Sequence, residues 1–213
     1  MNVLLVAGGS MNQWPDLCNR KFDYYVGIDY GGLSIIKKGW RLDLAVGDFD
    51  SLSQQEREEV YHQAKEIKQA KAEKDDTDTQ LALSFVLEKF PAAKVTIVGG
   101  TGGRLDHFLS NLWLPMEPRF QPFIRQIQLL DQQNSIQYYL PGEYTVEKEL
   151  EMTYLAYCCL TPVKSLTLAE SKYTLDHIDV LVPTSYASNE FVGDSAAFSF
   201  ETGIIAVIQS RDK

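Results

Sequence analysis

Two different rhythms of apolar residues divide this chain of 213 residues. In the first part, short apolar runs alternate with stretches of helical periodicity. After Trp113 only strand-like runs remain, and Pro115, Pro118 and Pro122 interrupt the segment between the two parts. Because strands that alternate with helices indicate crossover units, the first part predicts a mainly parallel α/β sheet. The second part predicts a small all-β domain, a sandwich or a barrel, with the boundary near residue 120.

The apolar pattern also predicts where the individual elements lie. The expected strands of the first part are Val3–Ala7, Tyr24–Ile28, Leu42–Val46 and Val95–Val98. The expected helices are Leu33–Lys38, Gln54–Glu66, Thr79–Phe90 and Leu105–Leu114. Ser53 and Glu56 have the spacing of a helix capping box. The expected strands of the second part are Ile127–Leu130, Ile136–Leu140, Tyr144–Val146, Tyr154–Leu160, Leu166–Leu168, Ala196–Phe200 and Ile204–Ile208.

Charge and composition exclude several classes of partner. The formal net charge is -9 and no run of lysine and arginine is visible, so we expect no nucleic-acid partner. No apolar run approaches the roughly 20 residues needed to span a bilayer, and we expect no membrane partner. Cys18, Cys158 and Cys159 have neither disulfide nor zinc spacing, which predicts buried free thiols. Together these features indicate a cytoplasmic protein.

Four polar or glycine-rich segments directly follow the expected strands of the first part. They are Gly8–Ser10, Asp29–Gly32, Gly47–Ser51 and Gly99–Arg104. In an open parallel sheet, ligands bind beyond the carboxyl ends of the strands. We therefore expect all four segments to meet at one edge of the sheet and to form a ligand site there.

Two pairs of aspartates in these regions suggest a metal site. Asp48 and Asp50 are two residues apart, which places them on one side of an extended backbone. Asp75 and Asp78 are three apart at a helix start and can share a face of the first turn. Helix capping and the helix dipole are the alternative explanation. However, clustered like charges repel unless a cation such as Lys74 or Mg²⁺ lies among them, and we predict Mg²⁺, which binds carboxylates and phosphates together.

A glycine-rich turn before the last expected helix predicts phosphate binding. Its four glycines within five residues are Gly99, Gly100, Gly102 and Gly103. Glycine lets backbone N–H groups approach phosphate oxygens closely. Arg104 follows with a planar fork for two oxygens, and Asp106 and His107 open the helix. The lysine of a Walker A loop is absent, and His107 alone would be interpreted as a packed or solvated side chain.

These motifs resemble those of the thiamine pyrophosphokinases in order and spacing, over essentially the whole chain. The matching segments are Asp29-x-Gly31-Gly32, Leu44–Ser51, Lys74-Asp75-x-Thr77-Asp78 and Gly99-Gly100-x-Gly102-Gly103-Arg104-x-Asp106-His107. Lys172-Tyr173-x-Leu175 and Ser188-Asn189-Glu190 resemble the carboxyl-terminal signatures of that family.

The resemblance implies a fold and an activity. The fold is a Rossmann-like α/β nucleotide-binding domain over residues 1–120, followed by a smaller all-β sandwich over 121–213 that binds thiamine and forms a homodimer. By the same resemblance, thiamine is expected to lie in a cleft shared by the two subunits. The activity is the Mg²⁺-dependent conversion of thiamine and ATP to thiamine diphosphate and AMP.

The resemblance also implies roles for individual residues. It assigns the metal and the polyphosphate to Asp48, Asp50, Asp75 and Asp78. Arg104 and Asp106 are expected at the phosphates. The other expected binding residues are Asp29, Gly31, Gly32, Thr77, Gly99, Gly100, Gly102, Gly103 and His107, with Tyr173, Ser188 and Asn189 toward thiamine.

Two other functions are compatible with the same residues. A divalent-metal phosphoesterase also uses aspartate clusters, to activate water. A regulator that binds the nucleotide or thiamine without turnover is the second alternative. No serine–histidine–aspartate or cysteine–histidine grouping stands out, so the sequence offers no nucleophile for covalent catalysis.

Overall fold

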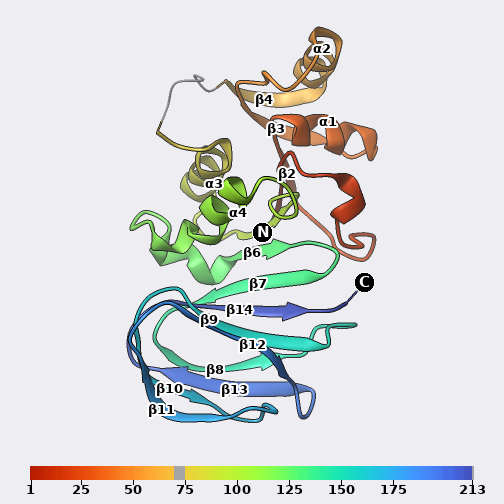
Figure 1. The fold of residues 1–213 in the computed structure, drawn as a ribbon. Coiled ribbons are helices and arrows are strands. Elements are labelled where there is room, and N and C mark those ends of the chain that lie inside the picture. Colours follow the sequence, from red (N-terminus) through yellow and green to blue (C-terminus); the bar gives the residue numbers. More distant parts are fainter. Residues whose placement is uncertain (70–74, 213) are drawn as a thin grey trace. The chain divides into compact units, whose positions relative to one another are not determined.

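The computed structural model of the chain describes residues 1–69 and 75–212, so Lys74, the alternative cation beside Asp75 and Asp78, lies outside the described residues. The chain forms two compact units (Figure 1). The first unit comprises Met1–Leu114 and Leu129–Gln132, and the second unit comprises Pro115–Gln128 and Gln133–Lys213. The predicted boundary at residue 120 lies within the first segment of the second unit.

A parallel sheet forms the centre of the first unit. Its strands are β1 (Asn2–Val6), β2 (Tyr24–Ile28), β3 (Leu42–Gly47), β4 (Ala64–Gln69) and β5 (Lys94–Val98). They lie in the order β5-β1-β2-β3-β4, and each neighbouring pair is parallel. The strands β1, β3 and β5 are buried along almost their whole length, which is why they are continuous apolar runs. The predicted parallel α/β sheet is confirmed.

Helices connect these strands, and two of them begin with a complete capping box. The helices are α1 (Tyr30–Lys37), α2 (Gln54–Gln63), α3 (Asp78–Lys89) and α4 (Leu105–Leu112), with a short 3₁₀ helix η1 (Met11–Gln13) after β1. Ser53 and Glu56 form the predicted box at α2. Thr77 and Gln80 form the same arrangement at α3, which the sequence analysis did not identify. Each box satisfies two backbone N–H groups that the helix itself leaves without a partner.

The prediction that a helix extends from Gln54 to Glu66 is wrong in its last turn. Helix α2 ends at Gln63, and the backbone is extended from Ala64, where β4 begins. Strand β4 pairs in parallel with β3 along its whole length. Among the described strands it is the last in its sheet, so its side chains are mostly polar and show no apolar alternation.

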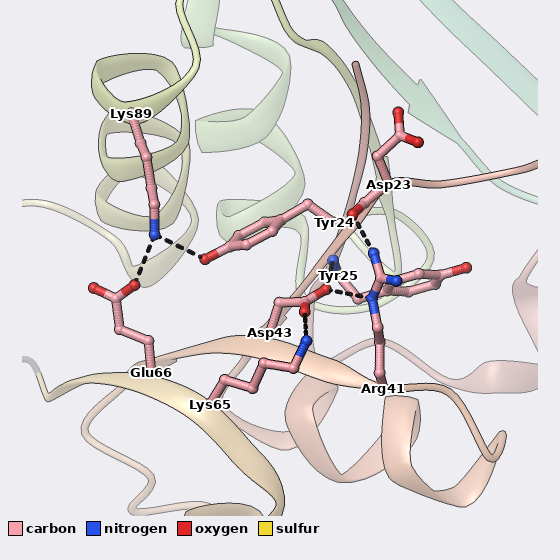
Figure 2. A network of polar contacts seen from close by, with 8 residues as sticks. All are labelled: Asp23, Tyr24, Tyr25, Arg41, Asp43, Lys65, Glu66 and Lys89. Atoms are coloured by element: carbon pink, nitrogen blue, oxygen red, sulfur yellow. Dashed lines mark hydrogen bonds and ion pairs between the residues drawn. The ribbon is translucent and has the colours of Figure 1, made fainter.

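The buried aspartate of β3 connects three strands on the side of the sheet shown in Figure 2. The Asp43 side chain is only 4% exposed. Its carboxylate accepts hydrogen bonds from the Arg41 guanidinium at 2.9 Å and from the Lys65 ammonium at 2.8 Å. It also accepts the backbone N–H of Tyr25 in β2 at 3.0 Å. A buried carboxylate is tolerated here because it is paired with cations and hydrogen-bonded.

We expect this carboxylate to make part of the folding free energy depend on pH. Burial raises the pKa of Asp43, but the hydrogen bonds from two cations and an amide outweigh burial and hold the pKa below its ordinary value of 3.8. A lowered pKa in the folded state means that the stabilisation is complete above the ordinary pKa and is lost as the pH falls through the folded-state pKa. Urea unfolding between pH 3 and pH 6 measures it. An Asp43→Asn variant should lose less stability on acidification than the wild type, and parallel pH curves would contradict this assignment.

The second unit is built from antiparallel strand pairs. Two 3₁₀ helices, η2 (Leu114–Met116) and η3 (Gln121–Gln126), occupy the proline-rich segment. Strand β6 (Ile127–Leu130) has its first two residues in the second unit and its last two in the first. The strands that lie wholly in the second unit are β7 (Asn134–Tyr139), β8 (Gly142–Glu147), β9 (Tyr154–Cys159), β10 (Val163–Leu168), β11 (Leu175–Val180), β12 (Thr184–Glu190), β13 (Ser195–Phe200) and β14 (Ile205–Ser210). Within the second unit they are ordered β12-β9-β14-β7 in one sheet and β11-β10-β13-β8 in the other.

The two sheets of the second unit share one apolar core. Tyr157 of β9 and Val207 of β14 contribute from one sheet, and Leu166 of β10 and Phe198 of β13 contribute from the other. Phe198 is 3% exposed and its ring contacts several other aromatic rings. Burial of apolar side chains from both sheets is the main stabilising interaction of this unit.

Two strands of the second unit, β11 and β12, were not predicted. Each of them lies at one end of its sheet in the described part of the chain. Four consecutive residues of β11 are exposed, from Asp176 to Asp179, and β12 has only one buried residue, Asn189. Strands whose side chains contact solvent on both faces carry no alternation of apolar and polar residues, so the sequence pattern does not reveal them.

The three cysteines are free thiols, as predicted, but only one is fully buried. Cys159 is buried, Cys158 is half-buried, and Cys18 is exposed, so the expected burial of Cys18 is wrong. Burial raises the pKa of Cys159 to about 11, which keeps this thiol protonated at neutral pH. Over residues 1–69 and 75–212, none of the helices combines the length and the apolar character needed to cross a membrane.

Candidate active site

A cleft of about 540 Å³ lies at the carboxyl edge of the parallel sheet. It is lined by residues that follow β1, β2, β3 and β5 and by the first residues of α3 and α4. The predicted site residues among its lining are Asp29, Asp50, Thr77, Asp78, Gly99, Gly100, Gly103, Arg104 and His107. The structure therefore brings together segments that are up to about 100 residues apart in the sequence, as expected for the open edge of a parallel sheet.

Gly31 and Gly32 are predicted binding residues that do not line the cleft. Both are buried in the first turn of α1. A Cβ atom at Gly31 would lie 1.9 Å from the carbonyl oxygen of Val6, and one at Gly32 would meet the side chain of Val60 at 3.4 Å. The close approach of α1 to β1 thus explains the need for glycine at position 31.

The loop after β3 does not have the extended backbone that was assumed for its two aspartates. Phe49 lies between them with a φ of 59° and is fully buried. Asp48 turns back, and its carboxylate accepts the N–H of Asp50 at 3.1 Å. Asp50 is exposed and lines the cleft, whereas Asp48 is half-buried and is not part of the lining.

The segment before α3 contributes a second acid to the cleft. Asp78 is the first residue of α3, where the helix dipole favours a negative charge. The Thr77 hydroxyl accepts the N–H of Gln80 at 3.2 Å, so this side chain caps the helix while it lines the cleft. Asp75 is exposed and is not among the lining residues.

The carboxylates of the cleft suit a magnesium ion that is completed by substrate. Asp50 and Asp78 line the same cavity, and the carboxylate of Asp29, the third aspartate of the lining, accepts the backbone N–H of Phe49. Among residues 1–69 and 75–212, no three His, Cys, Asp or Glu side chains are close enough to hold a metal by themselves. Mg²⁺ usually takes only one or two protein carboxylates and completes its octahedron with phosphate oxygens and water. One or two aspartates in a phosphate-sized cleft therefore fit this ion.

Backbone contacts hold the glycine turn after β5 against the turn after β1. The N–H of Gly9 donates to the carbonyl oxygen of Gly99 at 3.0 Å. A Cβ atom at Gly9 would lie 2.4 Å from that oxygen, and one at Gly99, whose φ is +70°, would lie 2.7 Å from the carbonyl oxygen of Ala7. Only glycine permits this approach, and it leaves the two turns side by side at the cleft.

Two polar side chains that the sequence analysis did not identify brace the same turn. The amide of Asn111, buried on α4, donates to the carbonyl oxygen of Gly100 at 2.9 Å. The hydroxyl of Thr101 donates to the carboxylate of Asp131 at 2.5 Å. The sequence offers no clear signal for either contact: Asn111 is one of four polar residues in α4, and Thr101 and Asp131 meet only in the folded chain.

Arg104 and Asp106 form an ion pair at the start of α4. The Arg104 Nε donates to Asp106 Oδ1 at 3.1 Å, and a second nitrogen of the guanidinium donates to the other oxygen. This hydrogen bonding lowers the pKa of Asp106 and raises the pKa of Arg104. Both side chains are well exposed, and only Arg104 lines the cleft, so Asp106 orients the guanidinium from outside.

The predicted thiamine residues lie in the second unit. Asn189 is buried and brackets the backbone of Tyr173: its Oδ1 accepts the Tyr173 N–H at 2.9 Å, and its Nδ2 donates to the Tyr173 carbonyl oxygen at 2.8 Å. The Tyr173 side chain is 60% exposed. Ser188 has a φ of 58° at the register shift between β12 and β9. Asn189 thus holds the backbone of Tyr173, and the side chain of Tyr173 remains accessible to solvent.

An α/β unit with glycine turns and aspartates at the carboxyl edge of its sheet defines a class of enzymes that act on nucleotide phosphates. Comparison with known proteins narrows this class. Residues 16–125 match the family model "Thiamin pyrophosphokinase, catalytic domain", and residues 143–205 match "Thiamin pyrophosphokinase, vitamin B1 binding domain". The chain belongs to the thiamin pyrophosphokinase family, and the resemblance inferred from its motifs is confirmed.

Individual relatives agree with this assignment over the full length of the chain. The thiamine pyrophosphokinase of Bacillus subtilis (strain 168) is 38% identical, over 99% of both chains. A crystal structure of a thiamin pyrophosphokinase family protein from Enterococcus faecalis is 60% identical, covers 100% of both chains and superimposes with a TM-score of 0.98. The crystal structure of the Bacillus subtilis protein covers 100% of both chains, with 35% identity and a TM-score of 0.87.

Proposed function

We propose that this chain transfers a diphosphate group from ATP to the hydroxyl of thiamine, giving thiamine diphosphate and AMP. The family assignment supports the reaction. The observation that carries the proposal is the cleft itself, where two glycine turns meet the carboxylates of Asp50 and Asp78. A polyphosphate is bound by backbone N–H donors, by an arginine, and by a divalent ion that carboxylates hold. The cleft offers all three kinds of protein group.

The reaction exchanges one oxygen–phosphorus bond for another. The hydroxyl oxygen of thiamine attacks the β-phosphorus of ATP, and the bond from that phosphorus to the oxygen shared with the α-phosphate breaks. AMP leaves with this oxygen, and the hydroxyl releases its proton. The chain contributes mainly position and charge neutralisation. Arg104, held in orientation by Asp106, faces negative charge that grows on the transferred group.

Asp50 and Asp78 would hold Mg²⁺ from within the cleft, and we assign Asp48 and Asp75, which come from the same two segments but do not line the cleft, to the surroundings of the ion and the polyphosphate. The ion neutralises the polyphosphate and orients its oxygens when it is bound. The hard carboxylate oxygens of the cleft match its chemistry. Gly99, Gly100, Gly102 and Gly103 give the phosphates access to backbone N–H groups.

We assign the nucleotide to the first unit, as a Rossmann-like domain, and thiamine to the second unit, as a β-sandwich. The glycine turns of the first unit support the nucleotide assignment. The match of residues 143–205 to a vitamin B1 binding domain supports the thiamine assignment, and this range includes Tyr173, Ser188 and Asn189. Free cysteines, one of them exposed, support a reducing compartment, and we place the enzyme in the cytoplasm.

We further propose a homodimer, in which an apolar stripe on α4 is covered by the second subunit. Leu105, Leu109 and Trp113 are spaced by four residues, which places them on one side of the helix. Their exposed fractions are 76%, 38% and 52%. Large exposed apolar patches mark interaction sites. Light scattering of the purified chain measures the mass, and a monomer at all concentrations would contradict the proposal.

Product analysis tests the reaction. Purified protein is incubated with ATP, Mg²⁺ and thiamine, and the nucleotides and thiamine esters are separated by chromatography. We expect AMP and thiamine diphosphate in equal amounts, with neither formed when thiamine or Mg²⁺ is omitted. Inorganic phosphate without a thiamine requirement would identify a phosphoesterase instead. Tight binding of ATP or thiamine without any product would identify a non-catalytic regulator.

A further inference from the structure

Asp29 has a backbone conformation that its own helix does not explain. It lies between β2 and α1 with a φ of 47° and a ψ of -118°, a region that non-glycine residues rarely occupy. It is the N-cap residue of α1, yet its side chain makes no capping hydrogen bond. Strained backbone persists where the surrounding structure fixes it, and it is concentrated at functional sites. We therefore look for the contacts of the Asp29 carboxylate outside α1.

The carboxylate reaches across to the loop that follows β3. Asp29 Oδ1 accepts the backbone N–H of Phe49 at 3.2 Å, and the Asp29 N–H donates to the carbonyl oxygen of Val46 at 3.0 Å. A Cβ atom at Gly47, whose φ is +145°, would lie only 1.8 Å from Asp29 Oδ1. Glycine at position 47 thus leaves the space that this carboxylate occupies.

The hydrogen bond holds the loop at the residue between its two aspartates. Phe49 is fully buried, and its ring packs edge-to-face on Tyr61 with 5.3 Å between the ring centroids. The ring fixes one side of this residue, and Asp29 fixes its amide. Because Asp48 and Asp50 are bonded directly to Phe49, the directions of their side chains depend on this anchor.

We propose that Asp29 is a positioning residue, which holds the Phe49 amide so that Asp48 and Asp50 are presented to the metal and the polyphosphate. The inference rests on the proposed function, since it concerns the same cleft. It replaces the expectation that Asp29 itself binds ligand. A ligand of Mg²⁺ needs the negative charge of Asp29, whereas an anchor for an amide needs only an oxygen acceptor.

Two substitutions at Asp29 separate these roles. Asparagine and glycine both tolerate a positive φ, but only asparagine keeps an oxygen that can accept the Phe49 N–H. We expect Asp29→Asn to retain kcat within about threefold of the wild type, because the hydrogen bond survives. We expect Asp29→Gly to lower kcat by about tenfold or more, since a small displacement of catalytic groups is costly. Thermal unfolding confirms that each variant is folded.

Hydrogen exchange at the Phe49 amide gives a readout that does not depend on activity. We expect faster exchange in Asp29→Gly and near-normal exchange in Asp29→Asn. An Asp29→Asn variant that loses activity while its Phe49 amide stays protected would show that the charge matters, and the proposal would be rejected. Unchanged exchange or near-normal kcat in Asp29→Gly would also reject it. If the wild type forms no thiamine diphosphate, the reaction is wrong, but exchange still decides whether Asp29 anchors the loop.

Discussion

Replacing Asp78 with asparagine is expected to lower kcat by about 100- to 1,000-fold while the protein remains folded. The change preserves the shape of the side chain and removes its charge. Asp78 lines the cleft at the first residue of α3, and we propose that it holds the metal. Even the outer-shell partners of a metal site cost about 10- to 100-fold in affinity or activity when they are removed, and a ligand is expected to cost more.

Rates of AMP release measured over a range of Mg²⁺ concentrations test this expectation. Higher Mg²⁺ should partly restore the activity of Asp78→Asn if weaker metal binding is the cause. Glu59→Gln on α2 is the matched control, because Glu59 is exposed and is not among the residues that line the cleft. Near-normal turnover of Asp78→Asn would remove this aspartate from the site.

The largest effect on stability is expected at Phe198. Its ring centroid lies 5.0 Å from that of Tyr139, 5.4 Å from Tyr144, 5.2 Å from Tyr157 and 6.2 Å from Phe200. Removing a buried aromatic ring loses its transfer free energy and leaves a cavity, which costs about 3–5 kcal/mol. We therefore expect Phe198→Ala to lower the free energy of unfolding by that amount.

Urea unfolding followed by near-UV circular dichroism measures the loss, because the tyrosines around Phe198 report on the packing of the second unit. Phe198→Leu fills more of the cavity and is expected to cost clearly less than Phe198→Ala. Equal costs for the two variants, or a cost near zero for alanine, would show that these rings are not the centre of the core.

The sequence predicts elements best where burial imposes a clear pattern. Strand β2 is found with its correct bounds, Tyr24–Ile28, and β6 with Ile127–Leu130. Strand β4 is mistaken for the end of a helix. Its side chains are mostly polar and show no strand pattern, because the strand is held by backbone hydrogen bonds to β3. Strands β11 and β12 are missed for the same reason: their hydrogen bonds come from neighbours in the sheet, and their side chains carry no periodic signal.

The site was predictable as a set of segments and unpredictable in its internal contacts. The rule that ligands bind at the carboxyl edge correctly brings Asp29, Asp50 and the glycine turn to one cleft. Asp78 was expected at the metal for a different reason, as one of two aspartates at a helix start, and it lines the same cleft. The same rule cannot show that the Asp29 carboxylate holds Phe49, or that Phe49 has a positive φ. These contacts link residues about 20 positions apart, and they follow from the packing of β2 against β3.

The lysines of β4 have a consequence for how the sheet ends. In the described part of the chain β4 pairs only with β3, so it presents backbone N–H and C=O groups that another strand could use. Lys65 and Lys68 are exposed there, and they lie on opposite faces because side chains alternate along a strand. An incoming strand would have to bring its backbone close to both ammonium groups, which discourages edge-to-edge growth into fibrils.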